Sequence, residues 1–424
     1  MDQSSIRNVS HYYERFADRY LDSVLDKLSA VSLIGPRASG KTTTAARHAA
    51  SVVRLDVPAQ AAVFRADPDA ALRRFTEPIL LDEWQEVPDV LAAVKRAVDA
   101  DSRPGRFILT GSVRAEVEAN TWPGTGRVVR VPIFPMTARE IQGLGVGIGI
   151  VERLFEADLS AFPPAAVAEP AVSMDVNNYL ALALRGGFPD VIGRDDDATN
   201  IWLASYVEEV IHHDAALVRQ GIDTTRFGAY LEAMASHTAG IVEESTILDA
   251  VRIDRRTAYA YWNVLCNLFI AEQVPAWWSN HLTRLVATEK RYLIDSGLAA
   301  AILKLTPDAV IRDINWIGRL IDTFVAAQIR PEIALSPLRP RLHHLRTKGG
   351  RQEVDLLVEF GGGTVAGIEV KATAAPEMSD ARHLRWMRDE LGDRFLMGIV
   401  LHTGPYSFQL DDKIIAAPIS TLWA

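Results

Sequence analysis

The chain has 424 residues, 48% of them hydrophobic, and a formal net charge of −9 at pH 7. This predicts a globular protein of two or three domains and excludes a surface coated in basic residues, so any nucleic-acid contact must come from a local patch. No apolar run approaches the roughly 20 residues that span a bilayer. The N-terminus has no secretory pattern, and the single cysteine, Cys266, excludes an intramolecular disulfide. We therefore expect a cytoplasmic protein without membrane contact.

Residues 1–30 carry apolar side chains at helical spacing and predict a helix that leads into a sheet. A strand predicted at 31–34 and a helix predicted at 42–50 flank a match to the phosphate-binding pattern G-x-x-x-x-G-K-[S/T]. In that pattern, backbone N–H groups curl around phosphates, the lysine reaches the β/γ phosphates, and the hydroxyl ligates Mg²⁺. The residues expected to bind ATP are Gly35, Pro36, Arg37, Ala38, Ser39, Gly40, Lys41, Thr42 and Thr43, with Thr42 also on Mg²⁺. The alternative is a vestigial loop.

A strand is predicted at 52–55 and a short helix at 68–75, and a further apolar strand then ends in two acids. Asp82 is expected to hold Mg²⁺, directly or through water, and Glu83 to polarise the water that attacks the γ-phosphate. Because an acid pair after a P-loop is typical of one class of ATPases, it predicts an additional strand between the P-loop strand and this one.

The segment 107–112 is the candidate for that strand, with Thr110 or Ser112 sensing the γ-phosphate or orienting the water. The alternative is a turn whose hydroxyls bond to the backbone. Arg127 precedes a strand predicted at 128–133 and is the candidate to reach phosphate, in the same chain or from a neighbouring one. A solvated surface arginine is the other interpretation. Lys41, Glu83, Ser112 and Arg127 are the expected catalytic residues.

The first domain is expected to span 1–143, and the Gly-, Ala- and Pro-rich stretch at 144–175 to be a hinge or insertion. A helical domain is expected at 176–300 and a third domain at 301–424. The helical domain contains helix candidates at 245–251 and 255–269, separated by a tight turn, followed by a strand candidate at 271–276 that would begin a wing.

In a winged helix-turn-helix of this kind, Arg255, Arg256 and Tyr259 on the second helix would approach DNA. Acidic residues nearby offset these cations, and such units also bind proteins, so a protein partner is the alternative.

The third domain contains two alternating runs, 353–360 and 364–371, joined by three glycines, which predicts a β-hairpin. If Phe360 pairs with Thr364, the register places Asp355 across from Glu369 and Glu353 across from Lys371. The two acids and Lys371 then share one polar face.

This face is typical of a metal-dependent nuclease site of the D…E-x-K type, with Asp355 and Glu369 on a divalent ion and Lys371 stabilising developing charge. A basic stretch at 330–351 precedes it and suits a phosphodiester substrate. The alternative is a ladder of salt bridges on a solvated face.

Several motifs together resemble those of the bacterial and archaeal AAA-type ATPases that combine an N-terminal P-loop domain with a C-terminal restriction-endonuclease-like domain. The motifs are G-P-R-A-S-G-K-T at 35–42, L-L-D-E at 80–83, L-T-G-S at 109–112, G-R at 126–127, G-G-F-P at 186–189, Y-L-I-D-S-G-L at 292–298, and E-V-D with I-E-V-K at 353–371. The resemblance implies an α/β P-loop domain with a parallel sheet, a winged-helix-like middle and an α/β nuclease-like end. Domains of this last type usually offer a further acid from the preceding helix, and Asp322 stands where a glutamate is usual.

The function that follows is a Mg²⁺-dependent ATPase coupled to a module that binds DNA or RNA or cleaves it with a second divalent metal. The alternative is a non-cleaving, ATP-driven switch that regulates a protein or DNA partner, and either form is compatible with an oligomer.

Overall fold

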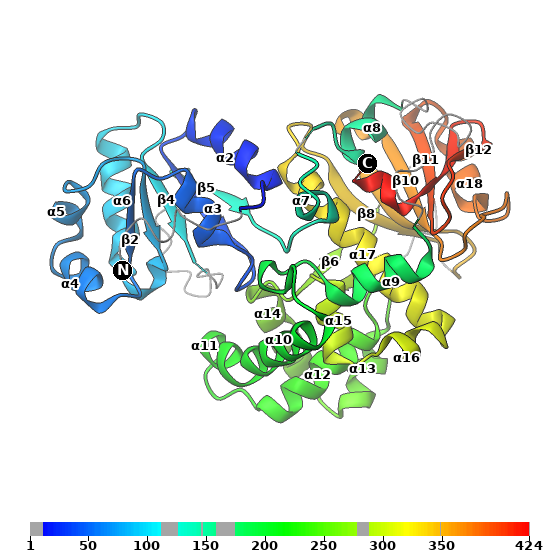
Figure 1. The fold of residues 1–424 in the computed structure, drawn as a ribbon, viewed down its shortest axis with the longest axis horizontal. Helices are drawn as coiled ribbons and strands as arrows, with labels where there is room; N and C mark the ends of the chain where they lie inside the picture. The colour runs from blue at the N-terminus through cyan, green and yellow to red at the C-terminus, as the bar shows by residue number, and fades with distance from the viewer. Residues whose placement is uncertain are drawn as a thin grey trace. The chain divides into compact units, whose positions relative to one another are not determined.

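The computed structural model describes residues 12–111, 126–145, 147–157, 174–277, 288–347 and 349–423. The chain divides into two compact units (Figure 1). The first consists of Met1–Met136 with the short segments Phe188–Asp190 and Asn267–Phe269, and the second contains the rest of the chain.

The first unit is an α/β domain built on one sheet. Its elements are α2 (Phe16–Leu25), β1 (Ala30–Ile34), α3 (Lys41–Arg47), β2 (Ser51–Arg54), α4 (Pro58–Ala66), α5 (Pro68–Leu72), β3 (Ile79–Asp82), α6 (Asp89–Ala100), β4 (Phe107–Thr110) and β5 (Val128–Pro132). The five strands run parallel in the order β2-β3-β4-β1-β5. Because β4 lies between the P-loop strand β1 and the acid-bearing strand β3, the predicted additional strand is confirmed.

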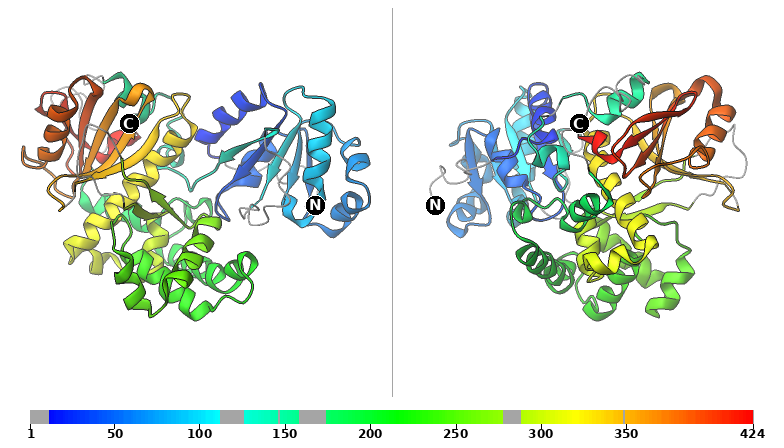
Figure 2. Two further views of the ribbon diagram at one scale, coloured as in Figure 1. Left: turned by 180° about the vertical axis from the view of Figure 1, so that it is seen from behind. Right: turned by 45° about the vertical axis from the view of Figure 1, so that its right-hand side comes forward.

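Both faces of this sheet are covered, as the continuous apolar strands require. Every second residue of β3 and β4 packs in one apolar cluster with α4, α5 and α6. These residues are Ile79 and Leu81 of β3 and Phe107 and Leu109 of β4. Leu80, between the first two, is equally buried and points to the other face. Figures 1 and 2 show α2 and α3 on that side of the sheet. This packing holds the carboxyl ends of β1, β3 and β4 at one edge.

Most helices of the second unit lie between residues 138 and 335, and one more follows at 382–391. They are α7 (Ala138–Ile141), α8 (Ile150–Glu156), α9 (Val176–Arg185), α10 (Asp196–Glu209), α11 (Ala215–Val218), α12 (Thr224–Ser236), α13 (Glu244–Val251), α14 (Arg255–Asn267), α15 (Ser296–Ile302), α16 (Pro307–Ile311), α17 (Ile314–Leu335) and α18 (Arg382–Leu391). After α14, β6 (Ala271–Val274) and β7 (Lys290–Leu293) form a two-stranded antiparallel sheet.

The rest of the second unit is built on a mixed six-stranded sheet. Its strands are β8 (Arg341–Arg346), β9 (Glu353–Glu359), β10 (Val365–Val370), β11 (Phe395–His402), β12 (Phe408–Asp411) and β13 (Ile414–Pro418), in the order β12-β13-β11-β10-β9-β8. Leu357, Val365 and Val400 pack in one cluster with Leu384 and Met387 of α18. Helix α17 contacts β8 and β10, and Figure 1 shows the two helices flanking the sheet.

Two motifs that are far apart in the sequence meet in the second unit. Asp295, which caps α15, accepts a hydrogen bond from the backbone N–H of Gly187 at 2.8 Å. A Cβ at Gly186 would lie 2.3 Å from Oδ1 of Asp295, and a Cβ at Gly297 would lie 2.7 Å from the backbone of Arg185. The glycines at 186 and 297 are therefore required by this close approach, which gives both motifs a structural role.

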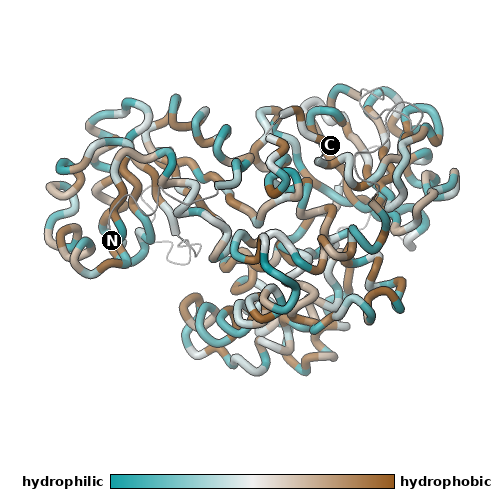
Figure 3. Tube along the Cα trace, in the orientation of Figure 1, coloured by the Kyte–Doolittle hydropathy of each residue, from teal (hydrophilic) through white to brown (hydrophobic). Residues whose placement is uncertain are grey.

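Apolar residues predominate along the strands of the five-stranded and six-stranded sheets (Figure 3). None of the helices in the described part of the chain is both long enough and apolar enough to cross a bilayer.

Candidate functional site

The P-loop lies between β1 and α3, and its backbone admits only glycine at its first position. Gly35 has a φ of +154°, and a Cβ there would lie 2.0 Å from the carbonyl oxygen of Ile133. Gly40, at a φ of +91°, turns the chain into α3. The predicted strand, loop and helix are confirmed in the order that phosphate binding requires.

Lys41 is buried and is held against the loop. Its Nζ donates to the carbonyl oxygens of Gly35, at 3.0 Å, and Pro36, at 2.6 Å. Burial lowers the pKa of Lys41 from its ordinary value to about 8, against the opposing effect of the carboxylates of Glu83 and Asp82. The ammonium group therefore lacks full charge compensation until an anion approaches.

Asp82 joins three neighbouring segments through one oxygen. Its Oδ1 accepts hydrogen bonds from the hydroxyl of Thr42, at 2.7 Å, and from the hydroxyl of Thr110, at 2.6 Å. The carboxylate is buried at the end of β3, and the two threonines come from the start of α3 and the end of β4. A hydroxyl beside a carboxylate is a donor set that fits Mg²⁺. Ser112, which the sequence offered beside Thr110, lies outside the described residues.

Glu83 follows Asp82 in the left-handed region, at a φ of +53°, and its side chain is half-buried. Its carboxylate accepts a hydrogen bond from the side-chain amide of Gln85. Burial raises the pKa of Glu83, and the nearby charge of Asp82 adds to that effect, while Gln85 and Lys41 oppose it. The turn thus holds a carboxylate of raised pKa beside the P-loop lysine.

Arg15 is a residue of this site that the sequence did not reveal. Its guanidinium is buried and donates to the carbonyl oxygens of Ser39, at 3.0 Å, and Phe134, at 2.7 Å. It thereby fixes the P-loop to the end of β5. A single arginine ahead of a helix has no pattern that would have indicated this contact.

Arg127 is not beside the P-loop of its own chain. It precedes β5, whose first residue Val128 pairs with Ala30, the first residue of β1. Parallel strands place these starts at one edge of the sheet and the P-loop at the other. The Arg127 guanidinium pairs there with Asp99 of α6 at 2.9 Å. The geometry does not support the expectation that Arg127 meets phosphate in the same chain.

The hairpin β9–β10 has the predicted register. Val365 pairs with Glu359 and Ile368 with Leu356, and the N–H of Phe360 donates to the carbonyl oxygen of Thr364 at 2.8 Å. Continued by one residue, this register sets Asp355 across from Glu369.

Around these acids lies a polar cluster, here called the hairpin cluster: Asp322, Asp355, Glu369, Lys290, Lys371 and Tyr292. Lys371 donates to Glu369 Oε2 at 2.8 Å, and Lys290 donates to Asp322 Oδ2 at 2.7 Å and Asp355 Oδ1 at 3.3 Å. Tyr292 donates to Asp322 Oδ1 at 3.0 Å. The sequence therefore identified three acids and one lysine of this cluster, and missed Lys290 and Tyr292, which come from β7.

The charges of the hairpin cluster are strongly coupled. Burial raises the pKa of Asp322 to about 6, and burial together with Asp355 raises the pKa of Glu369 well above its ordinary range. Burial also disfavours the charge on Asp355, but Lys290 and Lys371 outweigh it, so its pKa lies below the ordinary value.

The expected second divalent-metal site is not supported. Within the described ranges, no three His, Cys, Asp or Glu side chains are arranged to hold a metal ion. In the hairpin cluster the ammonium of Lys290 lies between Asp322 and Asp355 and pairs with both.

The basic stretch before the hairpin is partly exposed: Arg339, Arg341 and Arg351 are exposed, whereas two other members are buried. Arg330 is buried in α17 and pairs with Glu272. His344 is buried and its Nε2 lies 2.9 Å from the carbonyl oxygen of Thr288. Folding thus directs these side chains into the interior of the second unit.

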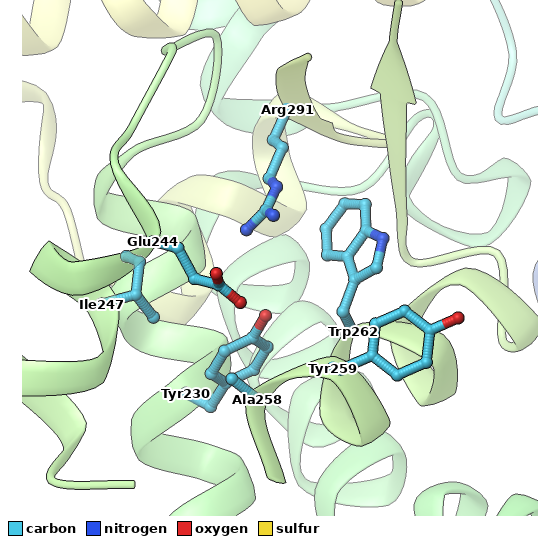
Figure 4. Close-up of a pocket in the computed structure, with 7 residues that line it drawn as sticks. All are labelled: Tyr230, Glu244, Ile247, Ala258, Tyr259, Trp262 and Arg291. Carbon is cyan, nitrogen blue, oxygen red and sulfur yellow. The ribbon is translucent and has the colours of Figure 1, made fainter. Parts of the chain in front are cut away.

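The helices α13 and α14 and the strand β6 lie where the sequence predicted them, and β7, which the sequence did not predict, pairs with β6. Beside them lies a small pocket lined by Tyr230, Glu244, Ile247, Ala258, Tyr259, Trp262 and Arg291 (Figure 4). The Arg291 guanidinium lies 4.7 Å from the ring centroid of Trp262. The outer side of α14 presents Arg255, Arg256 and Tyr259, and Arg255 pairs with Glu244 at 2.9 Å.

Known families match three successive parts of the chain. One described as "AAA domain" matches residues 27–142, one described as "Domain of unknown function (DUF8612)" matches 176–309, and one described as "Domain of unknown function (DUF4143)" matches 317–422. Together with the five-stranded parallel sheet, the first match supports a P-loop ATPase fold for the first unit. The third match, at 317–422, does not confirm the predicted nuclease-like fold of the C-terminal domain.

Among known proteins, uncharacterized proteins of Mycobacterium bovis and Mycobacterium tuberculosis are each 25% identical to the chain over 410 residues, which is 95% of this chain and 83% of theirs. Among solved structures, the Walker-type ATPase paby2304 of Pyrococcus abyssi is 16% identical with a TM-score of 0.43, over 70% of this chain and 97% of that one. The Orc1 protein of Aeropyrum pernix in complex with DNA is 12% identical with a TM-score of 0.26, over 72% and 96%. Similarities this low say nothing about function.

The pKa of Lys41 predicts that ATP binding depends on pH. Phosphate oxygens favour the ammonium, so binding raises a pKa that is about 8 in the free protein. As pH rises through about 8, the free protein loses the proton while the complex retains it, so affinity should fall and binding should take up a proton.

Isothermal titration in buffers of different ionisation enthalpy measures this uptake, which should be substantial near pH ~9 and small near pH ~6. The Lys41→Arg variant keeps its charge throughout and should show much less uptake. Equal uptake in both proteins at the higher pH would assign the proton to another group.

Proposed function

We propose that this chain is a Mg²⁺-dependent ATPase. The observation that carries the proposal is the pair of hydrogen bonds from Thr42 and Thr110 to the buried carboxylate of Asp82, beside the P-loop lysine. In the proposed arrangement, Lys41 binds the β/γ phosphates, and Thr42 and Asp82 hold Mg²⁺, which neutralises phosphate charge when bound. Glu83, whose raised pKa suits a general base, polarises the attacking water.

We further propose that the nucleotide cycle operates a switch in the second unit that binds DNA without cleaving it. The outer side of α14 supports the DNA contact, because Arg256 and Tyr259, three residues apart on a helix, are neighbours on one exposed face. An arginine beside an aromatic ring suits contact with a phosphate backbone.

The nuclease alternative rests on the register that brings Asp355 and Glu369 side by side with Lys371. One observation weighs against it. The described part of the chain shows no metal-binding group of acids. The non-cleaving form is therefore the one that we favour.

The first test separates nucleotide binding from turnover. Lys41→Ala should weaken ATP binding by about 100-fold or more, because charge-assisted hydrogen bonds to phosphate disappear. Glu83→Gln should retain ATP binding while kcat falls by about 10²–10⁴-fold, the usual contribution of a general base. Fluorescent-nucleotide titration and phosphate release measure the two quantities.

Glu86→Gln, an exposed acid of the same turn, is the matched control and should hydrolyse ATP normally. Turnover by Glu83→Gln at the parent rate would remove Glu83 from the proposed role.

The second test concerns DNA. Arg256→Glu should weaken binding of a duplex measured by fluorescence anisotropy, and should lower the slope of log affinity against log salt by about 1 for each phosphate that the protein no longer neutralises. Arg312→Glu, at an exposed position after α16, makes the same charge change as a control. Equal weakening in both variants would indicate only the general effect of net charge.

The same preparations, incubated with plasmid or single-stranded DNA and with Mg²⁺ or Mn²⁺, with and without ATP, should leave the DNA intact. Metal-dependent products that disappear in an Asp355→Ala/Lys371→Ala variant would restore the nuclease alternative.

A further inference from the structure

We infer that the ammonium of Lys290 occupies the position that a divalent cation would take in the hairpin cluster, so that this cluster is a lysine-neutralised site without a metal. The inference concerns the chemistry of the second unit, deepens its proposed non-cleaving role, and does not depend on ATP hydrolysis in the first unit.

Lys290 lies where a cation shared by Asp322 and Asp355 would bind. Its Nζ is 2.7 Å from Asp322 on α17 and 3.3 Å from Asp355 on β9, and 3.4 Å from the carbonyl oxygen of Asp355. A cation that bridged the helix acid and the strand acid would have to lie among these same three oxygens. The lysine side chain is 3% exposed, so solvent does not offer the ammonium another place.

Each carboxylate oxygen of the two aspartates already accepts a hydrogen bond from a protein donor. Each oxygen of Asp322 meets one, Lys290 on one side and the hydroxyl of Tyr292 on the other. The oxygens of Asp355 likewise meet Lys290 and the backbone N–H of Val370, the latter at 3.0 Å. Both acids are therefore satisfied by the protein itself.

One oxygen in the cluster differs from the rest. Glu369 Oε2 accepts from Lys371, while Glu369 Oε1 is buried and has no hydrogen-bond partner. A single such oxygen is far fewer than the six or more oxygen ligands that Mg²⁺ or Ca²⁺ takes, some of which can be water. The residues present thus fit an internal ammonium better than a divalent metal.

The charges of the cluster nearly balance without a metal. Two lysines face three carboxyl groups, which leaves at most one negative charge when every group is ionised. A divalent ion added to that set would give the buried cluster a net positive charge and would repel the ammonium a few ångströms away. Without Lys290, the same acids would carry two uncompensated negative charges when ionised, and three oxygens would lose this donor.

Unlike a bound metal ion, Lys290 is part of a strand, so its ion pairs connect that strand to other elements. It is the first residue of β7 and pairs with Val274 in the two-stranded sheet that follows α14. Its contacts to α17 and β9 therefore connect the helix-turn-helix region to the six-stranded sheet within the second unit. The cluster couples these two parts mechanically instead of activating water.

The test measures metal binding directly and uses the full-length chain with Asp82→Asn, which removes the proposed Mg²⁺ ligand of the first unit. Mn²⁺ is the probe, and loss of the free-ion signal in electron paramagnetic resonance counts the ions bound. In this parent, adding Asp355→Asn should leave the Mn²⁺ titration unchanged. If adding Asp355→Asn to this parent reduced Mn²⁺ binding, the inference would be wrong.

The converse variant removes the lysine. Lys290→Gln keeps a polar side chain of similar length but no charge, and should bind about one additional Mn²⁺ per chain through the released acids. Mn²⁺ should also raise its thermal unfolding midpoint, and adding Asp355→Asn should abolish both effects. Folding is checked by circular dichroism, and a folded Lys290→Gln variant that gains no Mn²⁺ would show that the lysine does not stand in the place of a metal.

Discussion

The nucleotide site depends on one buried carboxylate. Asp82 accepts the hydroxyls of Thr42 and Thr110 through the same oxygen and so connects the start of α3 with the ends of β3 and β4. A buried acid without donors would be costly, and two hydroxyls satisfy it while leaving lone pairs toward the P-loop. The parallel order β3-β4-β1 is what brings these three segments to one edge. Lys41, held against the loop and with its pKa lowered to about 8 by burial, is then ready for an anion.

The hairpin cluster shows a different solution to the same physical problem. Three acids on a helix and two strands, two of them buried and one half-buried, need positive charge, and in the second unit two lysines supply it. Because removing one partner of a buried ion pair leaves an uncompensated charge, such a cluster holds its elements in one arrangement. A metal-dependent nuclease and a rigid ionic connection can therefore share the same acids, and the residue between those acids distinguishes the two.

Local sequence patterns were sufficient to predict those features that residues adjacent in the chain determine. The P-loop, the acid pair after β3 and the hairpin register follow from glycine geometry, the burial of a continuous apolar strand and the alternation of side chains, and the structure has each of them. The surroundings of Arg127 and Arg330 do not follow from local patterns, for the opposite reason. Whether a charged side chain faces a ligand, an ion pair or the interior depends on segments distant in sequence: Asp99 meets Arg127, and Glu272 meets Arg330.

The sequence by itself determined the P-loop fold of the first unit, the residues expected to bind ATP and the pairing of Asp355 with Glu369, because each rests on spacing along one or two adjacent elements. Only the tertiary structure decided that Arg15 anchors the P-loop and that Lys290 lies among the acids of the hairpin cluster. Lys290 is 65 residues from Asp355, and no local period relates them. The physical reason is that a buried charge must be neutralised by whichever partner folding brings to it, and that choice is made in three dimensions.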